Sequence, residues 1–120
     1  MNPIKFKSQW GNEYDIIFVK ETYNNNGRLY VGCWYYDEEC GGYLPYCDVT
    51  VNLLVYLPDG NYGFLDINNG DQKLFELMAR KNFFKETDIC GHSGRCTYPT
   101  VEFTEEFLNM IDTDENNAEV

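Results

Sequence analysis

The predicted fold is decided by residues 14–36, which read YDIIFVKETYNNNGRLYVGCWYY. The first part, residues 14–22, is apolar and β-branched at its centre and predicts a strand. Asn-Asn-Asn-Gly follows at residues 24–27, and both residue types tolerate the positive φ of tight hairpin turns. Residues 28–36 therefore predict the returning strand of a β-hairpin.

The returning strand alternates between two apolar faces. One face holds Leu29, Val31, Cys33 and Tyr35, and the other holds Tyr30, Trp34 and Tyr36. A strand that is apolar on both faces is typical of the covered centre of a sheet. We therefore expect this strand to be covered on both sides.

The flanking sequence predicts further strands at residues 5–9, 49–57, 62–67 and 98–103. The turn residues at 58–61 join two of them into a second hairpin. Residues 37–42 and 86–96 break the apolar pattern and predict loops. Pro99 lacks an amide hydrogen, so it predicts that the last strand lies at an edge or begins there.

Two helices complete the predicted order. Residues 71–82 place apolar side chains on one side, with Asn69 or Asp71 as the N-cap. Thr104 caps a second, shorter helix that has acidic residues in its first turn. The fold class is therefore α+β, an antiparallel sheet of about five or six strands with two helices. Residues 1–111 are expected to form a single domain, and residues 112–120 a disordered acidic tail.

The charge restricts the partners. Twenty acidic and nine basic residues give a net charge of −11 at pH 7. Nucleic acid and anionic membranes are repelled by such a surface. Three interpretations remain: a soluble surface with no special role, a basic protein partner, or a surface that imitates nucleic acid. Of these, we expect a basic protein partner. No apolar run reaches the roughly 18 residues of a membrane span. The N-terminus lacks a signal-peptide pattern, so we expect a cytoplasmic protein.

The cysteines and the single histidine define a candidate metal site. Cys90, His92 and Cys96 lie within seven residues, and a further cysteine would complete a tetrahedral zinc site. Their spacing differs from that of common structural zinc sites. The alternative is that the five cysteines are reduced thiols, because their number is odd and no export signal is present. No cofactor is then needed.

A catalytic site is not predicted. Any Cys–His or Ser–His mechanism would have to use His92, which is the only histidine. The chain contains no glycine-rich phosphate loop and no nucleophile-elbow or zinc-protease motif. We therefore expect a protein that is not an enzyme.

Aromatic and acidic residues between positions 34 and 46 form the candidate partner-binding site. Carboxylates beside aromatic rings suit a surface that receives arginine and lysine side chains, through ion pairs and cation–π contacts. The alternative is a solvated loop beside a core strand. The candidate residues are Trp34, Tyr35, Tyr36, Asp37, Glu38, Glu39, Tyr43 and Tyr46.

Three segments together resemble a known family. They read YNNNGRLYVGCWYYDEECGGYLPYCDVTVNL from Tyr23, GFLDINN from Gly63 and GHSGRCTYPTVEF from Gly91. In this order they resemble a family of short uncharacterised domains encoded on mobile elements of gram-positive bacteria. The resemblance covers residues 14–103. It implies fold rather than activity, with Asn52, Asp66, Asn68 and Asn69 as turn and cap residues. The alternative is that this polar cluster at a strand end is a site.

The mobile-element setting that the resemblance implies also supplies a functional hypothesis. Small acidic proteins of such elements resemble anti-defence inhibitors, including anti-CRISPR and anti-restriction proteins. We therefore expect a non-enzymatic inhibitor that occupies a basic nucleic-acid-binding surface of a Cas or restriction nuclease. The alternatives are a zinc- or redox-responsive accessory protein that uses Cys90, His92 and Cys96, and an accessory protein of conjugation or plasmid upkeep.

Overall fold

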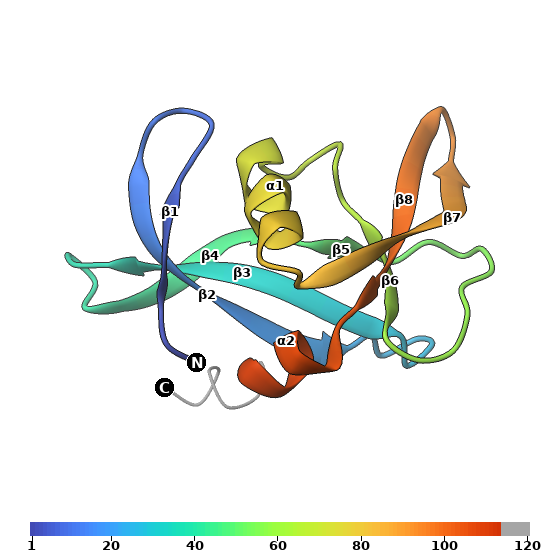
Figure 1. The fold of residues 1–120 in the computed structure, drawn as a ribbon, viewed down its shortest axis with the longest axis horizontal. Coiled ribbons are helices and arrows are strands. Elements are labelled where there is room, and N and C mark those ends of the chain that lie inside the picture. The colour runs from blue at the N-terminus through green and yellow to red at the C-terminus, as the bar shows by residue number, and fades with distance from the viewer. Residues whose placement is uncertain (114–120) are drawn as a thin grey trace.

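The computed structural model describes residues 1–113, which form two sheets and two helices (Figure 1). Sheet A has the antiparallel order β1 (Ile4–Lys7), β2 (Glu13–Thr22), β3 (Leu29–Asp37) and β4 (Gly42–Asp48), and the short β9 (Asp112–Thr113) runs parallel to β2. Sheet B has the antiparallel order β5 (Thr50–Val51), β6 (Tyr62–Leu65), β8 (Cys96–Phe103) and β7 (Phe84–Ser93). The helices are α1 (Gln72–Arg80) and α2 (Glu105–Met110). The predicted α+β class with antiparallel pairing is confirmed.

The hairpin predicted from residues 14–36 is confirmed as β2 and β3. The register pairs Phe18 with Cys33, and both side chains are buried on the inner face of sheet A. Gly27 has a φ of 71° in the connecting turn, a value that glycine adopts without strain. The two predicted faces of β3 are also correct. Val31 and Cys33 are in the core with Leu29 and Tyr35 packed against it, and the residues of the other face are not part of the core.

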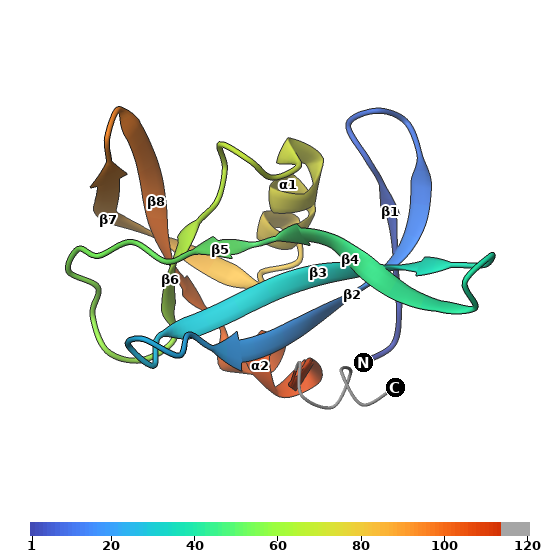
Figure 2. The same cartoon turned by 180° about the vertical axis from the view of Figure 1, so that it is seen from behind.

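The prediction that both faces of β3 are covered is wrong. The inner face packs against the core, but no other helix or strand of the described chain lies over the outer face, which points toward the viewer in Figure 2. Trp34 is half-buried and Tyr36 is 41% exposed on this side. The unpredicted strand β4 continues the sheet beside β3, so the segment after residue 41 is not a loop.

The chain crosses from sheet A to sheet B at Val49. This fully buried residue donates its backbone N–H to Val31 in β3 and accepts one from Asp66 at the end of β6. Two separate sheets therefore replace the single predicted sheet. The strand predicted at 49–57 is limited to Thr50–Val51, and the following loop leaves Leu54 87% exposed. The apolar run at residues 49–57 therefore predicted a longer strand than the structure contains, and only part of the run is buried.

The loop predicted at residues 86–96 is instead a β-hairpin formed by β7 and β8. Gly94 allows the tight turn with a φ of 60°, and pairing continues on both sides of it. Strand β8 lies between β6 and β7 and is not an edge. Pro99 is accommodated because the register between β7 and β8 shifts beside it, between Glu86 and Cys90.

The helices begin at the predicted caps. The Asp71 carboxylate accepts a hydrogen bond from the backbone N–H of Lys73, and the Thr104 hydroxyl accepts one from Phe107. Helix α1 buries Leu74, Phe75, Leu77 and Met78, and α2 buries Phe107 and Leu108. The helices and the inner faces of both sheets enclose one main core. Neither helix is long and apolar enough to cross a membrane.

The prediction of a disordered tail at residues 112–120 is wrong for the first two of these residues. Residues 112 and 113 form β9 beside β2, so the ordered chain continues past residue 111. Residues 114–120 lie outside the described residues.

Candidate protein-binding surface

The outer face of sheet A combines aromatic rings with carboxylates. We call it the aromatic–acidic face and define it by Asp15 on β2, by Tyr30, Trp34 and Tyr36 on β3, and by Tyr43, Pro45 and Asp48 on β4. The register brings these side chains to one side, since Trp34 pairs with Pro45 and Tyr36 pairs with Tyr43. The face therefore results from pairing of three strands.

One row of the face joins Tyr36, Tyr43 and Asp15. The two tyrosine rings meet edge to face, with centroids 5.4 Å apart. Partial burial raises the pKa of Tyr43 above its ordinary value, and the nearby negative charge of Asp15 raises it further. Asp15 also forms an exposed ion pair with Lys5, with a nitrogen–oxygen distance of 2.8 Å. This row presents two phenols and a carboxylate side by side.

A second row centres on Tyr30. Its hydroxyl donates a 2.7 Å hydrogen bond to the carboxylate of Asp48. The ring lies across Gly32, where any Cβ would collide with it, so the glycine makes room for the tyrosine. Tyr23 packs edge to face on the same ring at 5.7 Å. The carboxylate of Asp48 thus lies at the surface, hydrogen-bonded to an aromatic side chain that packs on its neighbours.

The structure separates the eight predicted binding residues. Trp34, Tyr36 and Tyr43 lie on the aromatic–acidic face, while Asp37, Glu38 and Glu39 lie at the β3–β4 turn that bounds it. Tyr35 and Tyr46 are inward-facing instead. The ring of Tyr35 lies 5.1 Å from that of Tyr14, and the Tyr46 hydroxyl donates to the buried carboxylate of Asp71. These two side chains serve the core.

Sequence reasoning missed Asp15, Tyr30 and Asp48 as members of this surface. Strand alternation placed Tyr30 with Trp34 and Tyr36, so a signal for that residue was present. Asp15 and Asp48 required the register with β3, which depends on strand pairing.

The predicted metal ligands do not converge. Pairing of Ser93 with Cys96 puts Cys96 on the side of the hairpin that also carries Gly91, whereas Cys90 and His92 project from the opposite side. All three side chains are exposed, and the Nδ1 atom of His92 is 3.2 Å from the hydroxyl of Thr97. Among residues 1–113 no group of three or more His, Cys, Asp or Glu residues is placed to hold a metal ion.

The five thiols divide into two classes. Burial raises the pKa of Cys47 to about 12 and that of Cys33 well above its ordinary value, whereas Cys40, Cys90 and Cys96 are exposed. The thiolate is the reactive form. At pH 8 we expect three thiols of the native protein to react rapidly with Ellman's reagent, and Cys33 and Cys47 to react only after unfolding.

Absorbance stopped-flow measurement checks this count, with protein in denaturant as the five-thiol control. Rapid reaction of a fourth native thiol would contradict it. Because the folded-state pKa of Cys47 is raised, the stability it contributes is fully present below pH 9. This stabilising contribution decreases as the pH rises from 9 toward 12, because in that range the Cys47 thiol is ionised in the unfolded chain but still protonated in the folded protein.

These features define a small α+β domain with two antiparallel sheets and an uncovered, aromatic and acidic sheet face. The chain belongs to the family described as Domain of unknown function (DUF4313), whose profile matches residues 18–119. No curated protein and no solved structure matches the chain.

Proposed function

We propose that this protein is a non-enzymatic binding protein whose aromatic–acidic face docks on a basic surface of another protein. The supporting observation is the row of Tyr36, Tyr43 and Asp15 on a sheet face that no other described helix or strand covers. Arginine and lysine side chains stack on such rings while their charged groups meet adjacent carboxylates. Tyrosine and tryptophan also supply contact area at low cost in conformational entropy.

The partner we propose is a defence nuclease of the bacterial cell that carries the protein, with its nucleic-acid-binding channel as the docking site. Two observations support this choice. The net charge of −11 suits a channel that normally receives phosphates, and the sequence resembles domains of mobile elements, which benefit from blocking such nucleases. The protein would then act in the cytoplasm as an inhibitor of the anti-CRISPR type.

The test uses a purified Cas nuclease with its guide RNA and a labelled DNA duplex. We expect the protein to compete with the duplex, and the affinity to fall by at least tenfold between about 0.05 and 0.2 M salt. Absence of binding across a panel of Cas and restriction nucleases would reject the anti-defence proposal. Binding that is insensitive to salt would reject docking through carboxylates.

A matched pair of variants tests the surface itself. The double change Glu38→Gln with Glu39→Gln removes two exposed charges beside the aromatic–acidic face, and we expect it to weaken binding by roughly tenfold. The control Glu86→Gln with Asp88→Asn removes the same charge from exposed positions of β7 in sheet B. Equal losses in both variants would mean that net charge, and not this face, determines binding.

A further inference from the structure

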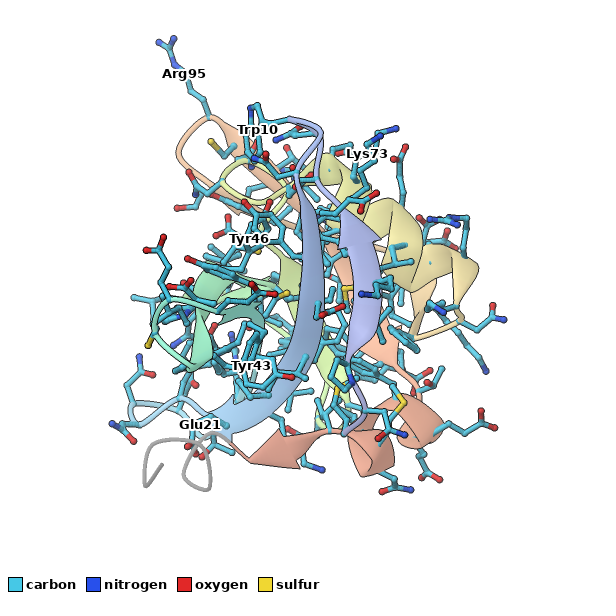
Figure 3. All side chains as sticks on the ribbon, turned by 90° about the vertical axis from the view of Figure 1, so that its left-hand side faces the viewer. Trp10, Glu21, Tyr43, Tyr46, Lys73 and Arg95 are labelled. Atoms are coloured by element: carbon cyan, nitrogen blue, oxygen red, sulfur yellow. The ribbon has the colours of Figure 1, made fainter. Side chains whose placement is uncertain are left out.

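A groove between β1 and α1 collects positive charge on this acidic protein. Its lining includes Lys5, Lys7, Lys73 and Arg80, four of the nine basic residues in the sequence. Phe6 and Leu77, both buried, also line the groove, which has a volume of about 510 Å³. Figure 3 shows β1 between β2 and α1, with Lys73 on the helix side. The charge distribution is therefore uneven, and the groove is a second surface that meets the aromatic–acidic face at the ion pair of Lys5 with Asp15.

The regular spacing of both elements creates this convergence. Lys73, Leu77 and Arg80 are at positions i, i+4 and i+7 of α1, which lie on one side of a helix. Three consecutive residues of β1, from Lys5 to Lys7, line the groove, and Ser8 directly after the strand also lines it. Side chains from both faces of a strand reach the same groove only where the strand presents its edge.

Two of the four cations remain available. Lys5 pairs with Asp15, and Lys73 pairs with Glu76 at 3.6 Å. Within residues 1–113, Lys7 and Arg80 have no carboxylate within ion-pair distance. Glu13, the partner of Lys7 in the strand register, is the nearest acidic residue of the neighbouring strand and lines an adjoining depression. The groove therefore offers two unpaired positive charges on facing elements.

The edge of β1 adds hydrogen-bonding capacity to these charges. Strand β1 is the last strand of sheet A on this side, and it pairs only with β2. Alternate backbone N–H and C=O groups of an edge strand point away from the sheet. Lysines on an edge strand discourage aggregation through that edge, which explains Lys5 and Lys7. Protection of the strand edge does not explain why Lys73 and Arg80 of α1 line the same groove.

We propose that this groove binds an extended acidic peptide segment of another protein. The segment adds to β1 as a further strand, and its carboxylates lie between Lys7 and Arg80. A polyphosphate chain fits less well, because it has no backbone N–H and C=O groups that could pair with the edge of β1. At physiological salt the Debye length is about 8 Å, so a short peptide responds mainly to the groove.

Fluorescence anisotropy with a labelled peptide of alternating valine and glutamate tests the proposal. We expect saturable binding to the full chain at about 0.15 M salt, weakened roughly tenfold by Lys7→Gln with Arg80→Gln. The control variant, Lys85→Gln with Arg95→Gln, removes the same charges from the β7–β8 hairpin, where Arg95 projects from the tip (Figure 3). No binding, or equal loss in both variants, would overturn the proposal.

Two further probes separate strand addition from simple charge attraction. Peptides that are N-methylated at every second amide, in both registers, keep their carboxylates but lose backbone donors in one register each. We expect one of the two to lose binding. Unchanged binding of both would overturn strand addition. A single-stranded oligonucleotide of similar length is expected to bind at least tenfold more weakly, and equal or tighter binding would assign the groove to phosphate instead.

Discussion

Replacement of Phe107 by alanine is expected to destabilise the protein by about 3–5 kcal/mol. The ring of Phe107 is 1% exposed and connects three parts of the fold. It stacks on Phe83 at 4.6 Å and on Phe103 of sheet B at 5.8 Å, and it meets Phe18 of sheet A edge to face at 5.3 Å. Its removal leaves a cavity where both sheets and α2 meet.

Urea unfolding followed by circular dichroism measures this loss. The control is Met110→Ala on the same helix, where the side chain is 39% exposed, and we expect a change below about 1 kcal/mol. A loss of similar size in both variants would mean that the destabilisation does not depend on burial of the Phe107 ring, since alanine itself favours the helix. A loss near zero for Phe107→Ala would contradict the packing described above.

Replacement of Asp71 by alanine is expected to cost about 2–4 kcal/mol, because it removes a buried acceptor with three donors. The carboxylate is 2% exposed. It caps α1 at the N–H of Lys73 (2.9 Å) and accepts the N–H of Gln9 (3.3 Å) and the hydroxyl of Tyr46 (2.7 Å). One side chain thus joins α1, the β1–β2 turn and β4.

A double-mutant cycle isolates the contribution of Tyr46. In the Tyr46→Phe background the hydroxyl is already absent, so Asp71→Ala should cost about 1 kcal/mol less than in the wild type. Asp71→Asn keeps a capping oxygen and should retain much of the helix contribution. Additive losses in the cycle would show that the hydrogen bond between Tyr46 and Asp71 contributes nothing to stability.

Local signals account for the parts of the fold that the sequence predicted. The hairpin of β2 and β3 depends on alternation along nine or ten residues and on a turn of Asn and Gly. The caps Asp71 and Thr104 act within three residues of their partners. Asn69 donates to the carboxylate of Asp66, as expected for a turn residue. Each of these interactions is short in sequence, so its pattern is visible in the chain.

The candidate site was predicted only in part, because some of its residues come together only through the pairing of strands that are distant in sequence. Trp34 and Tyr36 follow from alternation on one strand, but the place of Tyr46 depended on β4, which the sequence did not reveal. Gly41 lies directly before β4, Gly42 begins it and Pro45 lies within it, and both residue types are rare in strands, so the sequence did not predict this strand. The groove beside β1 joins residues that are far apart in the sequence, as the contact between Gln9 and Asp71, 62 positions apart, illustrates. No local pattern indicates such a pairing.

The sequence by itself determined the α+β class, the central hairpin, the helix caps and the acidity of the chain. Tertiary structure decided that the strands divide into two sheets at Val49, that one face of β3 remains uncovered, and that Cys96 turns away from Cys90. Propensity and alternation act over a few residues, whereas register and sheet membership follow from long-range burial. Those long-range contacts bring the charge of Asp15 close enough to raise the pKa of Tyr43, and they bring Lys7 and Arg80 to one groove. They therefore create both surfaces on which the proposed functions depend.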